Sequence, residues 1–182
     1  MGKLFVISGA SGVGKSTVLR AVMQDRDDLL FSVSATTRKP RPGETDGVDY
    51  YFVSKETFQD MIQKNEFLEY DGHMDNFYGT PKGQLEEKLT RGHVILDIEP
   101  NGAFAVRKAR PDATLVFVAP PSMEELERRL RGRGDTSEEQ MEMRLQRAAW
   151  EMEQSKLYDH VIINDTVENC AVQFCNIIAG QA

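Results

Sequence analysis

Short apolar runs alternate along most of the chain with segments in which apolar residues recur at helical spacing. Apolar runs that end in Gly, Pro or polar residues predict buried strands, and these are Lys3–Ser8, Leu29–Thr37, His93–Glu99, Ala113–Ala119 and Tyr158–Asn164. Spacings of three and four residues predict helices at Lys15–Gln24, Pro81–Gly92 and Thr166–Ala179, with further helices after the strands at 93–99 and 113–119. Strands that alternate with helices favour an α/β fold with a mainly parallel sheet flanked by helices.

The region 34–80 interrupts this alternation. It includes an irregular segment, 38–49, in which two Pro and two Gly disfavour both helix and strand. The other elements expected in this region are a strand at Tyr50–Val53, a helix at Ser54–Asn65 with Ser54 as its N-cap, an extended segment at Phe67–Met74 and a turn-rich segment at 75–81. We interpret the region as a lobe inserted into the main sheet.

The segment 131–139 (RGRGDTSEE) breaks the helical pattern in the last third of the chain. Thr136 and Glu139 have the spacing of a capping box for the next helix. Apolar residues follow at core spacing from Met141 to Ala148. The pattern therefore predicts two helices separated by a polar, Gly-containing turn.

The overall charge and the cysteine content limit the classes of partner. The net charge is −7 and the sequence pI is about 5.1, so we expect no polymeric nucleic acid as a partner. The chain contains no run of about 20 apolar residues, and the apolar run near Met1 is too short for a signal peptide, so we expect no membrane association and a cytoplasmic location. Cys170 and Cys175 lack metal-site spacing and are expected to be buried free thiols.

The segment from Gly9 to Ser16 matches the phosphate-binding motif G-x-x-x-x-G-K-[ST] at every fixed position. A predicted strand precedes it and a predicted helix follows, so backbone N–H groups can surround phosphate at a helix N-terminus. Lys15 would reach the β- and γ-phosphates of ATP, and Ser16 would bind Mg²⁺. The alternative is a glycine-rich turn without a ligand. The residues expected to bind ATP here are Gly9, Ala10, Ser11, Gly12, Val13, Gly14, Lys15, Ser16 and Thr17.

The motif admits several kinds of protein. Regulatory GTPases carry N-K-x-D and D-x-x-G, and neither occurs in this sequence. Motors and helicases are normally larger and need a surface for a polymer. A small nucleotide kinase fits the length of 182 residues, and such an enzyme needs a second site for its acceptor.

Arg38 and Arg41 flank Lys39 and Pro40 in the proline-constrained loop, and three tyrosines follow at 50, 51 and 78. Guanidinium groups bind phosphate through planar, bidentate contacts, and phenolic hydroxyls add further donors. These residues could hold a monophosphate, or they could form an ordinary solvated basic loop.

Several blocks together resemble guanylate kinases in order and spacing: SATTRKPRPGETDGVDYYFVS, EFLEYDGHMDNFYGTP, ILDIEPNG, FVAPPSMEELERRLRGRG and IIND. The resemblance covers nearly the whole chain. It implies a P-loop core (1–33, 81–125 and 156–182), a GMP-binding lobe (34–80) and a helical, arginine-bearing lid (126–155). It also implies ATP-dependent phosphorylation of GMP and dGMP with Mg²⁺.

The resemblance assigns roles at the acceptor site. Around the guanine base it places Ser34, Glu69 and Thr80, and the carboxylate of Glu69 suits the N1–H and N2–H donors of guanine. The resemblance also assigns Asp97 and Glu99 to GMP binding. Asp97 could in addition organise Mg²⁺ with Ser16, and at the position of Glu99 the family more often has Asp. The residues expected to hold the GMP phosphate are Arg38, Arg41, Tyr50 and Tyr78.

On the ATP side, the resemblance selects Arg133 and Asn164 as contacts near the adenine. The implied catalytic set is Lys15, Arg38, Arg129, Arg133 and Arg144. The acceptor is a phosphate oxygen that is already ionised, so no general base is needed, and catalysis would rest on in-line positioning and charge neutralisation.

Two alternatives remain at this stage. One is a non-catalytic guanylate-kinase-like binding module, although such modules have degraded P-loops. The other is a related kinase for a phosphorylated sugar, which would not need Ser34, Glu69 and Thr80. The sequence leaves open whether the protein is a monomer or a homodimer.

Overall fold

The computed structural model describes residues 2–24, 26–73, 75–132 and 137–181. Nine strands lie among these residues: β1 (Leu4–Gly9), β2 (Leu29–Phe31), β3 (Ala35–Thr36), β4 (Tyr51–Phe52), β5 (Phe67–His73), β6 (Asn76–Pro81), β7 (His93–Asp97), β8 (Thr114–Ala119) and β9 (His160–Ile163). The helices there are α1 (Lys15–Met23), α2 (Lys55–Gln63), α3 (Lys82–Arg91), α4 (Pro100–Ala109), α5 (Met123–Arg131), α6 (Glu138–Gln154), the short 3₁₀ helix η1 (Ser155–Leu157) and α7 (Val167–Ile178).

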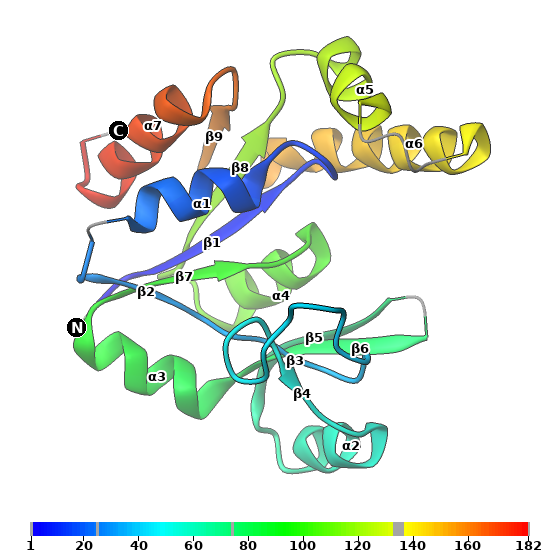
Figure 1. Cartoon of the computed structure of the whole chain (residues 1–182). Helices are drawn as coiled ribbons and strands as arrows, with labels where there is room; N and C mark the ends of the chain where they lie inside the picture. Colours follow the sequence, from blue (N-terminus) through cyan, green and yellow to red (C-terminus); the bar gives the residue numbers. More distant parts are fainter. Residues whose placement is uncertain (1, 25, 74, 133–136, 182) are drawn as a thin grey trace. The chain divides into compact units, whose positions relative to one another are not determined.

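The strands form two sheets, a five-stranded sheet with the order β2-β7-β1-β8-β9 and a four-stranded sheet with the order β4-β3-β6-β5 (Figure 1). The pairs β2–β7 and β8–β9 are parallel. The predicted α/β fold with a parallel sheet flanked by helices is therefore confirmed. The chain divides into two compact units, residues 1–5 with 28–113 and residues 6–27 with 114–182.

The first unit contains β2, β7, α3, α4 and the whole four-stranded sheet. Its part of the large sheet is built on β7, where Val94, Ile95 and Leu96 are fully buried, as expected for an inner parallel strand. The N–H of Val94 donates to the carbonyl of Lys3 (2.9 Å), which joins β7 to the chain just before β1.

Two predictions in the first unit are wrong. The expected strand Leu29–Thr37 is two strands, because β2 pairs with β7 in one sheet while β3 pairs with β6 in the other. The turn-rich segment 75–81 is largely strand β6, which pairs with β3 on one side and β5 on the other. Gly79 is required there by close packing, since a Cβ at this position would lie 2.9 Å from the ring of Phe67. The pairing on both sides overrides the turn preference of these residues.

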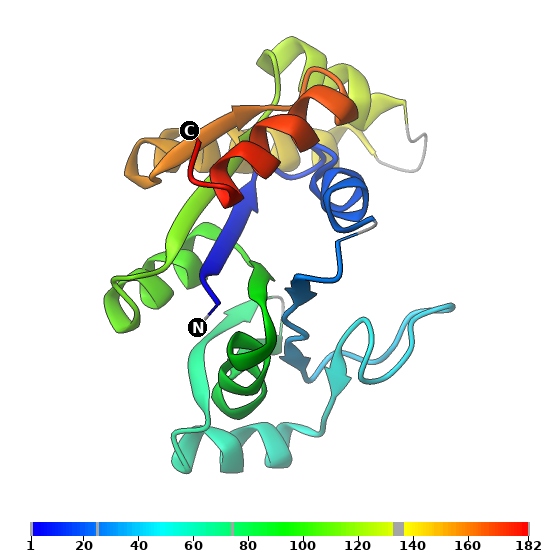
Figure 2. The same ribbon diagram turned by 90° about the vertical axis from the view of Figure 1, so that its left-hand side faces the viewer.

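A cluster of aromatic rings forms the core of the four-stranded sheet and α2. Phe58 of α2 stacks on Phe67 with ring centroids 4.4 Å apart and on Phe77 at 5.6 Å. Ser54 caps α2 as predicted, and its hydroxyl accepts from the N–H of Thr57 (3.1 Å). Figure 2 shows α2 at the bottom of the view, next to this sheet.

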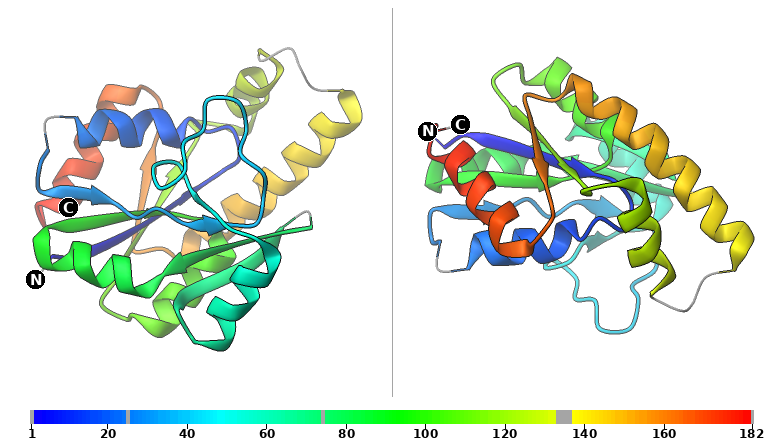
Figure 3. Two further views of the ribbon diagram at one scale, coloured as in Figure 1. Left: turned by 60° about the horizontal axis from the view of Figure 1, so that its bottom comes forward. Right: turned by 90° about the horizontal axis from the view of Figure 1, so that it is seen from above.

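The second unit contains most of β1 together with α1, β8, α5, α6, β9 and α7. Helices α1 and α7 pack side by side, in blue and red in Figure 3. Cys170 of α7 is a buried free thiol as predicted, whereas Cys175 is only half-buried. No helix among the described residues is long and apolar enough to cross a membrane.

The capping box of α6 lies one residue later than predicted. Ser137 is the N-cap, its hydroxyl accepts from the N–H of Gln140, and the Gln140 side chain returns a bond to the N–H of Ser137. Thr136, which we expected in the role of the N-cap, lies outside the described residues. Both Thr136–Glu139 and Ser137–Gln140 fit the capping-box pattern, and the start of α6 at Glu138 decides between them.

Replacing Phe58 should destabilise the aromatic cluster strongly. Phe58 is 1% exposed, so Phe58→Ala should lower the free energy of unfolding by about 3–5 kcal/mol. Urea unfolding followed by tyrosine and tryptophan fluorescence measures the change. Val48→Ala is the control, because Val48 is 64% exposed, and equal effects of the two substitutions would contradict the assigned core.

Candidate active site

A cavity of about 220 Å³ lies within the first unit, between the four-stranded sheet and the carboxyl end of β7. Six of the residues expected to bind the acceptor line it. The lining residues are Ser34, Tyr50, Glu69, Asp71, Tyr78, Gly79, Asp97, Ile98, Glu99 and Gly102. These six side chains, which are separated by up to 65 residues in the sequence, therefore form part of one continuous surface.

Glu69 of β5 is the most buried charged group of this cavity, with an exposed fraction of 7%. Its Oε1 accepts a hydrogen bond from the hydroxyl of Thr80 at 2.6 Å. Gly102 of α4 leaves room for the carboxylate, since a Cβ there would lie 2.9 Å from Oε2 of Glu69. Burial raises the pKa of Glu69, and the charge of Asp71 adds to the effect, while the Thr80 bond opposes it.

Thr80 is fully buried and donates its single hydroxyl proton to Glu69. A hydroxyl has one proton, so this bond uses the donor that Thr80 would need for a direct contact with an acceptor atom of the base. The structure gives Thr80 a clear function in orienting the Glu69 carboxylate. The direct contact with the base stays a prediction.

Three further carboxylates reach the same cavity. Asp71 follows Glu69 by two residues on β5, which places both side chains on one face of the strand. Asp97 is the last residue of β7, and Glu99 is the N-cap residue of α4 but makes no capping bond with its side chain. The cavity is thus an acidic pocket that suits a ligand rich in N–H donors.

Arg38 lies beside this pocket and forms a two-bond ion pair with Glu44. Its Nη1 and Nη2 donate to the Glu44 carboxylate at 2.9 and 2.8 Å, and Nη1 also donates to the carbonyl of Lys39. The hydrogen bond between the two side chains raises the pKa of Arg38 and lowers the pKa of Glu44. Glu44 also accepts from the N–H of Arg41 at 2.7 Å, so one carboxylate organises both arginines of the loop.

The tyrosines complete this end of the cavity. The Arg38 guanidinium lies 5.3 Å from the centroid of the Tyr50 ring, and the rings of Tyr50 and Tyr78 meet edge to face at 6.0 Å. Burial raises the pKa of Tyr50, and the nearby Asp97 carboxylate adds to this. The side chain of Arg41 is exposed, and its predicted contact with phosphate stays a prediction.

The P-loop lies in the second unit, between β1 and α1. Gly14 is the N-cap of α1 with φ 94°, a left-handed conformation that favours glycine, and a Cβ there would lie 3.0 Å from the amide nitrogen of Asn164. Because Gly14 has no side chain, nothing from this residue covers the first turn of the helix. Lys15 and Ser16 are the first two residues of α1, where backbone N–H groups point toward an approaching anion.

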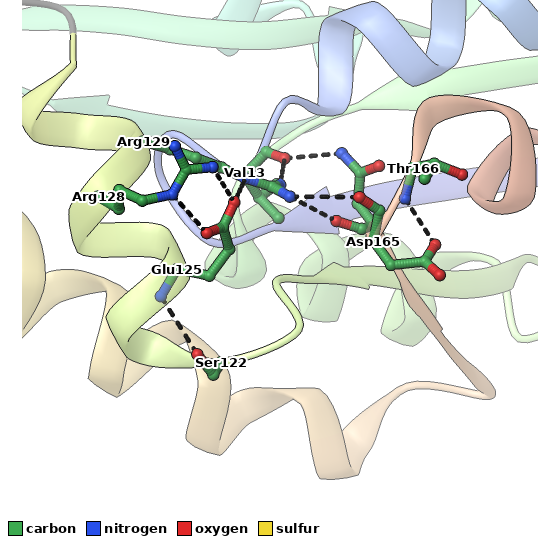
Figure 4. A network of polar contacts seen from close by, with 8 residues as sticks. Val13, Ser122, Glu125, Arg128, Arg129, Asp165 and Thr166 are labelled. Carbon is green, nitrogen blue, oxygen red and sulfur yellow. Dashed lines mark hydrogen bonds and ion pairs between the residues drawn. The ribbon is translucent and has the colours of Figure 1, made fainter.

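Arg129 of α5 makes several hydrogen bonds at the back of the P-loop, which are drawn in Figure 4. It donates to the carbonyls of Val13 (3.3 Å) and Asn164 (3.1 Å) and to Glu125 (2.8 Å). Hydrogen bonds from Arg128 and Arg129 lower the pKa of Glu125 to about 2. Asn164 is 3% exposed and its side chain also donates to the Val13 carbonyl at 2.8 Å.

The remaining arginines of this region differ in their surroundings. Arg128 and Arg131 pair with glutamates at the surface, as expected for ordinary ion pairs. Arg144 is half-buried on α6. Arg133, which we expected near the phosphates and the adenine, lies outside the described residues. The phosphate contacts of Arg129 and Arg144 stay predictions.

The residues of the cavity and the neighbouring arginine loop that were not identified from the sequence are Glu44, Asp71, Gly79, Ile98 and Gly102. The alternation of a strand through Glu69 could have identified Asp71. Nothing in the local sequence distinguishes Glu44 from the many surface glutamates, because its partners are set by the fold.

A P-loop in one unit and an acceptor cavity with adjacent arginine in the other define the class of P-loop kinases that phosphorylate a small molecule. Comparison with known proteins identifies the family. The family model for guanylate kinase matches residues 1–181. A guanylate kinase of Thermus thermophilus is 48% identical over 181 residues, which cover 99% of this chain and 82% of that relative. One from Clostridioides difficile is 46% identical, covering 99% and 88%.

Solved structures agree with this. The crystal structure of guanylate kinase from Anaplasma phagocytophilum has a TM-score of 0.80 and 34% sequence identity, covering 99% of this chain and 86% of that one. This chain belongs to the guanylate kinase family.

Removing Glu44 should weaken the acceptor site without touching the P-loop. Glu44→Ala leaves Arg38 without its two-bond partner, so the guanidinium loses its fixed orientation, and the KM for GMP should rise by about tenfold. The KM for ATP should stay within about twofold. Steady-state kinetics measures both, and Glu66→Ala, an exposed glutamate of the same unit, is the control. A rise in both KM values by the same factor would show that Glu44 does not serve the acceptor site.

Proposed function

We propose that this protein transfers the γ-phosphoryl group of ATP to GMP, and also to dGMP, in one in-line step without a covalent intermediate. ATP-dependent phosphorylation of GMP is the activity of the family to which the chain belongs. The observation that carries the choice of acceptor is the buried carboxylate of Glu69, held by Thr80 at the wall of the cavity.

Guanine suits this carboxylate. Its Watson–Crick edge presents the N1–H and N2–H donors side by side, and one carboxylate can accept from both. Adenine would place its N1 lone pair against the same carboxylate and leave a buried charge without a donor. Asp71, Asp97 and Glu99 line the same cavity and would make the pocket more favourable for an amino group.

At the other end of the cavity, Arg38, Arg41, Tyr50 and Tyr78 would hold the phosphate of GMP. Glu44 fixes the guanidinium plane of Arg38 in advance, so less side-chain freedom is lost when the phosphate binds. The phosphate would leave one ionised oxygen directed at ATP. That oxygen is already a nucleophile, so no side chain needs to remove a proton.

The P-loop would hold the phosphates of ATP, with backbone N–H groups at the start of α1 and the ammonium of Lys15 near the β- and γ-phosphates. Arg129, Arg133 and Arg144 would neutralise charge on the transferred group, and Asn164 would lie near the adenine. We propose that the lobe 34–80 and the lid 126–155 close over the substrates to exclude water, because water would otherwise accept the phosphoryl group.

We also propose that Mg²⁺ binds together with ATP. The hydroxyl of Ser16 at the start of α1 and the carboxylate of Asp97 at the end of β7 are hard oxygen ligands, which Mg²⁺ prefers when it is bound mainly through phosphates. The ion would supply neutralisation of the phosphate charge.

An acceptor panel tests the proposal directly. The purified protein is incubated with ATP, Mg²⁺ and each of GMP, dGMP, IMP, AMP and a phosphorylated sugar, and the products are separated by ion-exchange chromatography. We expect GDP and dGDP as the main products. A protein that binds ATP but phosphorylates none of the nucleotides would be a non-catalytic module, and preference for the sugar would overturn the assigned acceptor.

Glu69→Gln tests base recognition. The amide replaces one acceptor oxygen by a donor, so kcat/KM for GMP should fall by about two orders of magnitude, since each charge-assisted bond contributes about 1.5–3 kcal/mol. AMP should gain relative to GMP because the amide can donate to adenine N1. Kinetics with GMP, IMP and AMP in both proteins measures the ratios. An unchanged ratio of GMP to AMP would remove Glu69 from the base site.

The same variant gives a pH test. Burial raises the pKa of Glu69, and only the ionised form accepts from N1–H and N2–H, so the wild-type KM for GMP should rise as the pH falls, beginning above the ordinary range of a glutamate. The phosphate of GMP also titrates near pH ~6. The GMP phosphate titrates in the assays of both proteins, whereas the carboxylate at position 69 is present only in the wild type. The difference between the two pH profiles therefore isolates Glu69.

A further inference from the structure

A buried carboxylate lies directly against the backbone of the P-loop. Glu151 of α6 has a side chain that is only 4% exposed. Its Oε2 accepts from the N–H of Ser11 at 2.8 Å, and its Oε1 accepts from Nε of Arg147, one turn earlier on the helix, at 3.1 Å. Ser11 and Glu151 are 140 residues apart in the sequence, so the contact is made only by the fold of the second unit.

An anion in this place is costly and needs an explanation. Burying a carboxylate carries a large desolvation penalty unless hydrogen bonds and a cation compensate it. The phosphates that the P-loop is expected to bind are also anions, so a neutral side chain at 151 would avoid both the desolvation and the repulsion. The compensation that the structure provides is the N–H of Ser11 together with the guanidinium of Arg147.

The bond to Glu151 fixes the orientation of one peptide plane. In a trans peptide the N–H of Ser11 and the carbonyl of Ala10 point in opposite directions. The structure uses both, because the N–H donates to Glu151 while the Ala10 carbonyl accepts from the N–H of Val13 at 3.0 Å. A rotation of this peptide would break both bonds, so Glu151 holds the turn that begins the P-loop.

The end of the same turn is held from outside as well. The carbonyl of Val13 accepts from Asn164 at 2.8 Å and from Arg129 at 3.3 Å. Gly14, with its left-handed backbone, follows immediately and is the N-cap of α1. The four residues from Ala10 to Val13 are thus held at both ends by side chains from α5, α6 and the segment after β9.

We propose that Glu151 is a positioning residue for the binding of ATP. Glu151 acts through the Ala10–Ser11 peptide and does not touch the nucleotide. The inference rests on the proposed function for its kinetic consequences, but the binding of ATP is measurable by itself. Because Arg144 lies on the same helix, the shape of the P-loop is linked to the position of α6, which carries a predicted phosphate contact.

The test compares Glu151→Ala with Glu151→Gln. Glutamine keeps a carbonyl oxygen that can accept from the N–H of Ser11, whereas alanine has none. We expect Glu151→Ala to raise the Kd for a non-hydrolysable ATP analogue by about 10- to 100-fold, and Glu151→Gln to restore binding to within about threefold of the wild type. Isothermal titration calorimetry with the Mg²⁺ complex of the analogue measures both, and thermal unfolding shows whether each variant is folded.

Binding of GMP is the internal reference, because its proposed cavity lies in the other unit and should be unaffected. Glu153→Ala, an exposed glutamate on the same helix, is the matched control. Equal weakening in Glu151→Ala and Glu151→Gln, or wild-type affinity in both, would overturn the inference. A wild-type protein that fails to phosphorylate GMP would overturn the proposed function instead, while the affinities for the ATP analogue would still decide the role of Glu151.

Discussion

The buried carboxylate of Glu69 is the constraint on which the acceptor site depends. A carboxylate with 7% exposure must keep hydrogen-bond partners, and the hydroxyl of Thr80 supplies one on the neighbouring strand β6. Gly102 brings the start of α4 close to it without a clash. Strands β5 and β6 and helix α4 are therefore arranged around one charged group, whose remaining acceptor capacity is available to a ligand with N–H donors.

The charge distribution explains how an acidic protein can bind two phosphorylated ligands. The net charge of −7 gives no general attraction for phosphate. Attraction has to be local, and near the cavity we propose that it comes from Arg38, whose guanidinium is held by Glu44. In the proposed binding mode, the carboxylates that line the cavity act on the base rather than on the phosphate. Opposite ends of one ligand are thus matched, in this proposed mode, by opposite charges on the protein.

In the P-loop, as in the loop held by Glu44, side chains hold backbone groups in place. Its glycines allow the tight turn, but glycine also leaves the loop with many accessible conformations. The N–H of Ser11 donates to Glu151 and the side chain of Asn164 donates to the carbonyl of Val13, and these two bonds restrict that freedom. Side chains from α6 and from the segment after β9 thus hold the backbone of a loop near the beginning of the chain.

The sequence by itself predicted the alternation of strands and helices in the main sheet, the phosphate-binding motif and six of the residues that line the cavity, because periodicity and motif spacing depend on neighbouring residues. It could not show that Leu29–Thr37 divides between two sheets or that 75–81 forms a strand, since both depend on pairing partners far along the chain. The partners of Glu44, Thr80 and Glu151 were likewise decided only by the tertiary structure. A hydrogen bond needs its donor and acceptor within about 3 Å, and only the packing of distant elements brings them there.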